Sequence, residues 1–467
     1  DAAMEAHRGT AYLQMDTGLG KSRVGCAVIA RLGMPALVVV PTKSIAAGWV
    51  DEFAEIFPDL RVGMFANPPK TSKKKPAGPD THDVVIIIIN TFYEKDPEFL
   101  HGFGVIVLDE AHEYHSKEFS RALWLCQTKA VLGLSATPDV NPTGMDKYIY
   151  LHLGAPILQA SIPGFDVGDV QFRGVVRVVE YAGSPAHCGN VVTAAGTMSA
   201  IMTIGAVIRD EARLRLVVAE IIRLHDLHLT APAAELAALG LGPRPEEAAT
   251  PKHPAGVVRR HGVFVFAEHR EYLIAIRDAL LARVAAEDID APEIDAAPVA
   301  VAAPEVSVLR GGVAKADMTR AKRAGAHIVL TTYGFSRRGV SLADMTSIVA
   351  ATPRRNGSRQ LLGRFLRRGS DESIVRQMVD IVDVRTGLKS QLTERMKEYR
   401  VKKYPVSRVK CSWEDFMPAV DAAPDVAHVA IAPAVAAMDI VALLAAAAGG
   451  FEEEPADAEY GIEDVLA

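Results

Sequence analysis

Residues 17–22 have the composition of a phosphate-binding loop. The segment reads Thr17-Gly18-Leu19-Gly20-Lys21-Ser22 and lies between a strand-like run and a helical pattern, as such a loop requires. Glycine at 18 and 20 lets backbone N–H groups turn inward around phosphates. Lys21 can then reach the β- and γ-phosphates of a nucleotide, while the Ser22 hydroxyl can ligate Mg²⁺. A chance glycine-rich turn is the alternative, because Met15 stands where the usual pattern begins with glycine.

Two adjacent carboxylates make the phosphate-binding interpretation much stronger. The segment Asp109-Glu110-Ala111-His112 directly follows the apolar run Val105–Leu108. The pair is therefore expected at the carboxyl end of a buried strand, beside the loop. Asp109 can hold Mg²⁺ through water, and Glu110 can polarise an attacking water molecule. Such a pair is more often a helix N-cap, but both segments have the context that hydrolysis of a nucleoside triphosphate requires.

A third segment, Gln360-Leu361-Leu362-Gly363-Arg364-Phe365-Leu366-Arg367, contains two arginines three residues apart. One helical face can present both Arg364 and Arg367. Fixed guanidinium groups stabilise the charge that spreads over γ-phosphoryl oxygens in the transition state, and Gln360 would contact the nucleotide or the partner motif. The alternative is an ordinary solvated basic face, which is the preferred interpretation for four neighbouring residues: Arg354, Arg355, Arg359 and Arg368.

In this order, the three segments resemble the motifs of superfamily 2 helicases, in the branch that contains DEAH-box motors, restriction-enzyme translocases and Swi/Snf-type remodellers. The resemblance covers roughly residues 10–400. Residues 376–399 further resemble helicase-like proteins of large DNA viruses. Six more segments match family motifs in order and spacing: Val38-Val39-Val40-Pro41-Thr42-Lys43-Ser44, Asn90-Thr91-Phe92, Leu134-Ser135-Ala136-Thr137-Pro138, Val265-Phe266-Ala267-Glu268-His269-Arg270, Val329-Leu330-Thr331-Thr332 and Arg338-Gly339-Val340-Ser341-Leu342.

The resemblance also implies roles for individual residues. Ser135, Ala136 and Thr137 would couple the nucleotide state to strand binding, although a Ser/Thr turn is the simpler alternative. Gly339 would lie in the segment that contacts strand phosphates and senses the nucleotide. The residues implied to contact nucleic acid are Pro41, Thr42, Lys43, Asn90, Thr91, Thr331 and Thr332.

What the resemblance implies is an ATPase that uses Mg²⁺ and moves on or unwinds nucleic acid, with DNA favoured over RNA. ATP would lie between two lobes, and the strand would cross both lobes on the opposite face. The closest alternative is a duplex translocase, or an ATPase that releases transcripts without separating strands. Two alternatives from other classes are a nucleic-acid-binding scaffold without catalysis and a P-loop kinase, but the kinase would not explain the Gln360–Arg367 motif. The sequence leaves strand polarity, pathway, oligomeric state and protein partners open.

Short apolar runs alternate with helical patterns in two blocks, which predicts α/β domains with parallel sheets covered on both faces. With the motifs, this indicates two tandem RecA-like P-loop NTPase lobes, at residues 1–155 and 156–405. A partly disordered, Ala-rich acidic tail is expected at 406–467. Ala/Pro-rich stretches near 230–257 and 286–304 are expected to be surface insertions. The predicted strands are Thr10–Gln14, Ala36–Val40, Val84–Ile89, Val105–Leu108, Ala130–Leu134, Phe172–Val179, Val263–Phe266, Val306–Leu309, His327–Leu330, Ser347–Ala351 and Met378–Asp383.

The distribution of charge is compatible with a nucleic-acid partner, although the net charge is −6. Residues 421–467 contain ten Asp or Glu and no Lys or Arg, so residues 1–420 are net positive by four. No apolar run approaches the ~20 residues that span a bilayer. The four cysteines form no CxxC pair, which favours an intracellular, reducing compartment, either nucleus, cytoplasm or a viral factory. The chain begins at Asp1, which is compatible with a fragment that lacks its native start.

Overall fold

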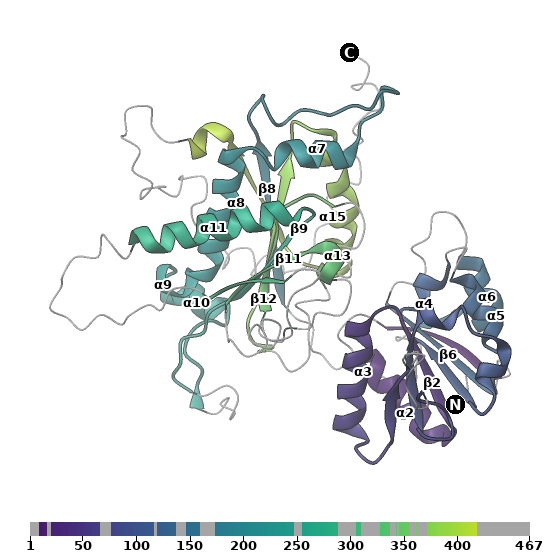
Figure 1. Cartoon of the computed structure of the whole chain (residues 1–467). Coiled ribbons are helices and arrows are strands. Elements are labelled where there is room, and N and C mark those ends of the chain that lie inside the picture. The colour runs from purple at the N-terminus through teal and green to yellow at the C-terminus, as the bar shows by residue number, and fades with distance from the viewer. Residues whose placement is uncertain are drawn as a thin grey trace.

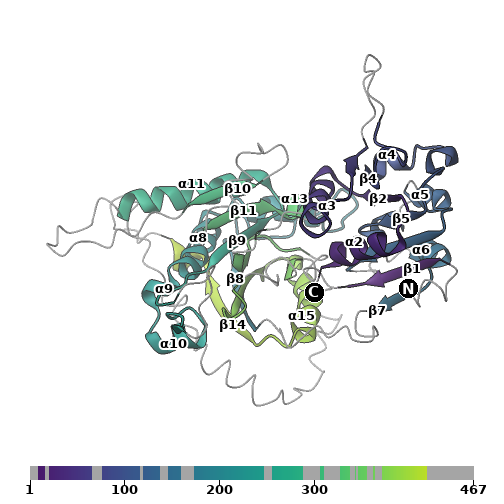
Figure 2. The ribbon, with the colours of Figure 1, turned by 90° about the horizontal axis from the view of Figure 1, so that it is seen from below.

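Two α/β units, each built on a seven-stranded sheet, make up the part of the chain that the structure describes (Figure 1). The structure is a computed structural model. It describes residues 9–15, 20–65, 76–115, 119–136, 146–158, 173–246, 255–287, 305–309, 327–336, 342, 345–354, 361–362 and 371–417. Seen from below, each sheet has helices on both of its faces (Figure 2). The expected fold class, two tandem RecA-like domains, is confirmed.

The sheet of the first lobe has the strand order β3-β4-β2-β5-β6-β1-β7, and every pairing in it is parallel. Its central strands are continuous apolar runs because both of their faces are buried. All its strands therefore end at one edge, which brings Met15, Pro41, Asp109 and Ala136 to the same side of the lobe. The strands are β1 (Thr10–Gln14), β2 (Ala36–Val40), β3 (Val62–Met64), β4 (Val84–Ile88), β5 (Val105–Leu108), β6 (Ala130–Ser135) and β7 (Pro156–Leu158).

Helices cover the two faces of this sheet with separate apolar clusters. On one face Cys26, Trp49 and Phe53 pack with the sheet. On the other face Phe92 and Leu123 belong to a second cluster. The helices of the first face are α2 (Lys21–Leu32) and α3 (Lys43–Ile56). The other face has α4 (Ile89–Phe92), η1 (Pro97–Leu100), η2 (Ala111–His115), α5 (Ser120–Leu125) and α6 (Asp146–Leu153).

The second sheet has the order β10-β11-β9-β12-β13-β8-β14, again with every pairing parallel. All strands predicted from the sequence are present in the two sheets, with shifts of a few residues at their ends. The strands of this lobe are β8 (Gly174–Ala182), β9 (Gly262–Ala267), β10 (Val306–Leu309), β11 (Ile328–Thr332), β12 (Met345–Ala350), β13 (Arg376–Asp383) and β14 (Val406–Ser412).

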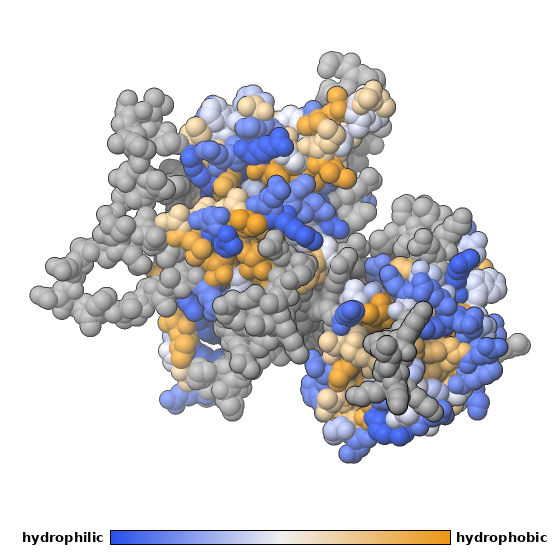
Figure 3. Space-filling model, viewed as in Figure 1, coloured by the Kyte–Doolittle hydropathy of each residue, from blue (hydrophilic) through white to orange (hydrophobic). Residues whose placement is uncertain are grey.

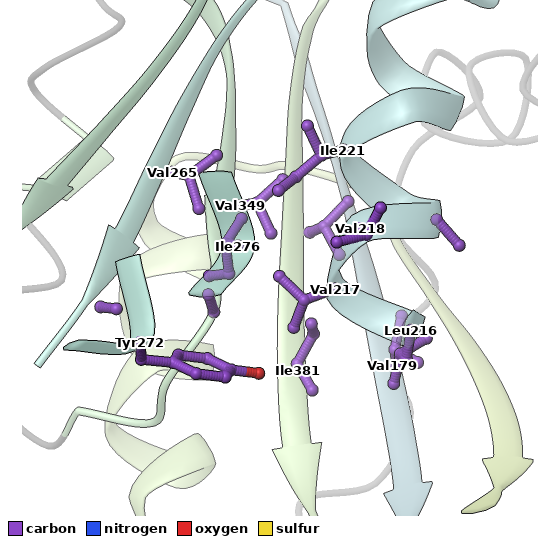
Figure 4. Close-up of a cluster of buried hydrophobic side chains, with 14 of the residues drawn as sticks. Val179, Leu216, Val217, Val218, Ile221, Val265, Tyr272, Ile276, Val349 and Ile381 are labelled. Atoms are coloured by element: carbon purple, nitrogen blue, oxygen red, sulfur yellow. The ribbon is translucent and has the colours of Figure 1, made fainter. Parts of the chain in front are cut away.

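The largest core cluster of the second lobe lies between α8 and α11 and one face of the sheet. Figure 4 shows Val217, Val218 and Ile221 of α8 beside Val349 and Ile381 of the strands. The other face packs a second cluster, which includes residues of α15. The helices of this lobe are α7 (Ala200–Val207), α8 (Glu211–His225), α9 (Leu227–Thr230), α10 (Ala233–Ala238), α11 (Arg270–Glu287), α13 (Tyr333–Ser336), η5 (Gly387–Ser390), α15 (Gln391–Val401) and η6 (Trp413–Phe416).

Both expected lobe boundaries need correction, because an edge strand of each sheet lies just beyond the boundary. Strand β7 begins at Pro156 and pairs with β1, so it completes the first sheet. Strand β14 begins after residue 405 and pairs with β8, so it completes the second sheet. Residues 406–417 therefore belong to the second lobe, and residues 418–467 lie outside the described residues. The sequence missed both strands because one is very short and the other is largely polar.

The stretch near 230–257 is also wrongly predicted as a surface insertion throughout. Its first part forms α10, and Leu239 and Leu241 are fully buried against Val175 and Val375. Because this stretch is rich in alanine, its composition did not indicate that the two leucines pack into a small apolar cluster. Residues 247–254, and most of the second expected insertion at 286–304, lie outside the described residues.

The surface near α7 is apolar, as the orange residues of Figure 3 show. Val192, Met198, Ile201 and Met202 are exposed there, and a patch of this kind is typical of interaction surfaces.

Cys26, Cys126, Cys188 and Cys411 are free thiols. Among the helices of the described residues, none has the length and apolar character needed to cross a membrane.

A buried ion pair gives a direct test of the second lobe. Arg213 and Asp383 have no exposed side-chain surface and lie 2.7 Å apart, Nε to Oδ1. Asp383→Ala should lower the free energy of unfolding by about 3–5 kcal/mol, because it leaves a buried guanidinium uncompensated. Asp83→Ala breaks a pair with Arg61 of the same length at the surface and should cost far less. Urea unfolding of both variants measures this, and equal losses would contradict the assigned role of burial.

Candidate nucleotide site

The start of α2 lies at the carboxyl edge of the first sheet, beside the end of β1. Gly20 caps this helix with φ 87°, a left-handed conformation that favours glycine. Lys21 is the first residue of the helix, and its Nζ donates a 3.4 Å hydrogen bond to the carbonyl oxygen of Met15. Ser22 follows in the same turn. Thr17, Gly18 and Leu19 lie outside the described residues, so the structure does not test the loop itself.

Asp109 is buried at the end of β5 and is held on both carboxylate oxygens. Its Oδ1 accepts a 2.9 Å hydrogen bond from the backbone N–H of Glu110. Its Oδ2 accepts a 2.8 Å hydrogen bond from Nε1 of Trp49. Burial raises the pKa of Asp109, and the neighbouring Glu110 carboxylate raises it further, while Trp49 and the Lys21 ammonium act in the opposite direction. The carboxylate therefore lies where a nearby cation would strongly stabilise its charged form.

Glu110 has a backbone conformation that is rare outside glycine. Its φ is 48°, one of two positive values among non-glycine residues in the described chain. Such strain is typical of functional sites. Its Oε2 is buried and accepts no hydrogen bond from the described residues, although it lies 3.3 Å from Nδ1 of His112. A buried acceptor with spare capacity suits a residue that must take a proton from water.

His112 joins this turn to the end of β6. Its Nδ1 shares a 3.0 Å hydrogen bond with Oγ of Ser135, and both side chains are buried. Ala136 is buried next to Ser135, and Thr137 lies outside the described residues. Two segments that the sequence singled out separately are thus in direct contact. In the sequence, His112 was singled out only as the last residue of the segment Asp109-Glu110-Ala111-His112. Nothing in the sequence indicated that it would contact Ser135.

The residues at this edge fit a nucleotide with Mg²⁺. A buried carboxylate whose pKa is raised by burial is relieved by a divalent cation, and oxygen ligands are those that Mg²⁺ prefers. Asp109 would hold the cation through water, together with the Ser22 hydroxyl. Lys21 is a cationic side chain available to phosphate at this edge, since its charge already acts on Asp109. In the described residues no group of three or more His, Cys, Asp or Glu forms a metal cluster.

The candidate strand contacts of the first lobe lie on the same edge. Thr42 caps α3, where its Oγ1 accepts a 3.4 Å hydrogen bond from the backbone N–H of Ile45, so this side chain has a structural role. Pro41 is half-buried beside it. Lys43 and Asn90 are exposed, and Thr91 is half-buried. Lys43 and Asn90 are therefore the side chains in this group that are open to a ligand.

In the second lobe the structure corrects one candidate strand contact. Thr331 is fully buried, and its Oγ1 donates a 2.8 Å hydrogen bond to the carbonyl oxygen of Leu309. Its hydroxyl therefore joins β11 to β10 and faces no ligand. Thr332 accepts a hydrogen bond from the backbone N–H of Phe335 and stabilises α13.

The arginine motif is described only at its apolar positions. Leu361 and Leu362 are buried in the core cluster that covers one face of the second sheet. Gln360, Arg364 and Arg367 lie outside the described residues, as does Gly339. The buried leucines show how the motif is anchored to its lobe, while the roles of the arginines stay predictions.

Comparisons with known proteins agree with the geometry. A family described as "Type III restriction enzyme, res subunit" matches residues 2–140. A protein of African swine fever virus (strain Badajoz 1971 Vero-adapted), named as an ATP-dependent RNA helicase, is 39% identical over 406 residues, which is 87% of this chain and 71% of that protein. The chain belongs to the superfamily 2 helicases.

More distant relatives agree with this assignment. A DNA 3'-5' translocase of Sulfurisphaera tokodaii is 24% identical over 125 residues, 27% of this chain and 26% of that protein. The structure of Dbp5 of S. cerevisiae bound to RNA and ADP BeF3 has a TM-score of 0.50, 11% identity, and a match over 86% of that chain and 87% of this one. That likeness concerns the fold. This superfamily 2 helicase is a nucleoside-triphosphate hydrolase that uses nucleotide and binds nucleic acid.

The contact between His112 and Ser135 leads to a prediction for this helicase. Ser135→Ala removes the hydroxyl that joins the two motifs, so stimulation of the ATPase by nucleic acid should fall several-fold while the unstimulated rate persists. Thr128→Ala is the matched control, because its hydroxyl bonds a carbonyl at the opposite end of β6. Steady-state ATPase with and without a polynucleotide measures both rates. An equal fall of the two rates would contradict a coupling role.

Proposed function

We propose that this helicase hydrolyses ATP with Mg²⁺ at the carboxyl edge of its first lobe. The main support is the convergence there of Lys21, Asp109 and Glu110 with the bonded pair His112 and Ser135. Glu110 would accept a proton from water at Oε2, a buried oxygen that lies 3.3 Å from Nδ1 of His112. Lys21 would bind phosphate oxygens. Arg364 and Arg367 of the second lobe would complete the site and stabilise the transition-state charge.

In this proposal a few side chains bind the cation and the phosphates. Mg²⁺ would supply charge neutralisation of the γ-phosphate. Asp109 and Ser22 would orient the cation. Asp109 is buried, which keeps bulk water away from its side of the cation. His112 positions Ser135, so a structural change in the segment Asp109–His112 would be transmitted to the segment that contains Ser135.

We further propose that the strand is held mainly through its phosphates and that DNA is the preferred substrate. Backbone contacts make binding weakly sequence-specific and sensitive to salt. The relation to a restriction-enzyme subunit and to a DNA translocase supports DNA. The name of the African swine fever virus relative argues for RNA. Two mechanisms are then open to this ATPase: unwinding of a duplex, or translocation along a duplex without strand separation.

The substrate is tested with matched single strands and duplexes of DNA, RNA and the hybrid. DNA should stimulate the ATPase several-fold and more than RNA of the same sequence. Stronger stimulation by RNA would overturn the DNA preference. A rate indifferent to every polynucleotide would overturn the motor itself, and hydrolysis without unwinding of any tailed duplex would favour the translocase.

Four substitutions separate binding from chemistry. Lys21→Ala should weaken ATP binding, because Lys21 would contact phosphates in the ground state. Glu110→Gln should bind ATP nearly as well and lose turnover, because the amide accepts no proton. Arg364→Ala and Arg367→Ala should spare much of the binding, and at least one should lose about 10³–10⁵ in rate, as for arginine fingers elsewhere.

ATP affinity and single-turnover hydrolysis are measured for each of these variants. A Glu110→Gln enzyme that hydrolyses ATP near the parental rate would refute the assigned base. Parental rates in both arginine variants would refute the contribution of the second lobe.

A further inference from the structure

Trp49 is a buried aromatic residue of α3 whose only polar atom is aimed at the ATPase site. The side chain is 1% exposed. Its Nε1 donates a 2.8 Å hydrogen bond to Oδ2 of Asp109, across 60 positions of sequence. A buried indole N–H needs an acceptor, but a backbone carbonyl would satisfy it equally well. The observed acceptor is instead the carboxylate expected to hold Mg²⁺.

This hydrogen bond determines how the Asp109 carboxylate is oriented. The oxygen Oδ1 is held by the backbone N–H of Glu110, while Oδ2 is held by Trp49. With a donor on each oxygen, the plane of the carboxylate cannot rotate without losing one of them. Each oxygen keeps a second lone pair for a water molecule of the cation. Without the indole, the terminal torsion of an aspartate is broad and roughly two-fold.

The indole is itself fixed by close packing against the helix that follows the phosphate-binding loop. A methyl group at Gly25 would lie 2.5 Å from Cη2 of Trp49 and 3.3 Å from Cδ1 of Leu134. Glycine at this position of α2 therefore makes room for the ring. Arg23 of α2 forms ion pairs with Glu52 and Glu55 of α3, which hold the two helices together. The donor, the loop helix and the carboxylate thus form one packed unit.

We propose that Trp49 is a positioning residue of the ATPase, which orients the Asp109 carboxylate for the hydrated Mg²⁺ of bound nucleotide. The inference rests on the proposed role of Asp109. Trp49 touches neither nucleotide nor cation in this assignment, and it acts through Asp109 alone. Its loss should therefore weaken the contribution of Mg²⁺ to nucleotide binding and leave binding of the nucleotide without Mg²⁺ intact.

The test compares full-length parent, Trp49→Phe, Asp109→Asn and Trp124→Phe. Trp124 is the matched control, because its ring is 63% exposed and contacts His152 instead of the site. Calorimetry measures the affinity for AMP-PNP, a non-hydrolysable ATP analogue, in excess Mg²⁺ and again in EDTA. The Mg²⁺ concentration that gives half-maximal ATPase is measured alongside, and thermal melting reports folding.

We expect Trp49→Phe to retain the affinity measured in EDTA and to reduce the gain in affinity from Mg²⁺ about tenfold, the lower end of the effect of one hydrogen bond to a charged group. Half-maximal ATPase should need correspondingly more Mg²⁺, while Trp124→Phe matches the parent. An equal loss of affinity with and without Mg²⁺ would overturn the proposal, because that is the result of a packing defect. If Asp109→Asn keeps the full gain from Mg²⁺, the proposed role of Asp109 fails and the inference fails with it.

Two further variants keep the test decisive if Phe disturbs folding. Benzothienylalanine at position 49 keeps the bicyclic shape and replaces the N–H with sulfur, so it removes the donor alone and should reproduce the loss. Gly25→Ala should displace the intact indole and give the same Mg²⁺ defect. Gly48→Ala on α3 is its control, because a methyl group there meets nothing within 4 Å. A parental response to Mg²⁺ in the benzothienylalanine protein would overturn the proposal.

Discussion

Parallel strands end at the same edge of a sheet, and both sheets of this helicase are parallel throughout the described residues. The whole site of the first lobe depends on this constraint. The turns after β1, β2, β5 and β6 are far apart in the sequence, yet they must emerge side by side. Side chains at the ends of these strands, such as His112 and Ser135, can then reach one another without further structure. The helices α2 and α3 close one face and supply Lys21 and Trp49.

Buried charges at this edge of the sheet must be compensated, because an uncompensated buried charge destabilises the fold. The Asp109 carboxylate is buried among apolar residues, and two hydrogen bonds and the Lys21 charge offset part of the cost. In the second lobe buried carboxylates are compensated by ion pairs, Asp383 with Arg213 and Asp380 with Arg395. The difference supports the proposal that Asp109 holds a cation, whereas Asp383 and Asp380 stabilise the fold.

The contacts around Ser135 and Trp49 connect the candidate site to the surfaces that would sense nucleic acid. Ser135 lies at the end of β6 and bonds His112, two residues after Glu110. Helix α3, which contains Trp49, begins directly after Pro41 and Thr42. The His112–Ser135 and Trp49–Asp109 contacts are single hydrogen bonds between buried groups, so each has a defined geometry. Packed side chains and hydrogen bonds of this kind can carry coupling between two binding sites.

Much of this protein was determined by local sequence patterns. Continuous apolar runs predicted the strands, including β2 and β5, because burial on both faces leaves no room for polar residues. Lys21, Asp109 and Glu110 could be proposed as site residues from the sequence because phosphate chemistry limits residue types and spacing. Only the tertiary structure decided which side chains meet. The donor to Asp109 is 60 residues away. Thr331 is a structural residue because its hydroxyl bonds a neighbouring strand, and the strand β14 pairs with β8 although its sequence is largely polar. These features depend on contacts between segments that are far apart in the sequence. A local pattern does not indicate which distant segment will pack against the residues that form it.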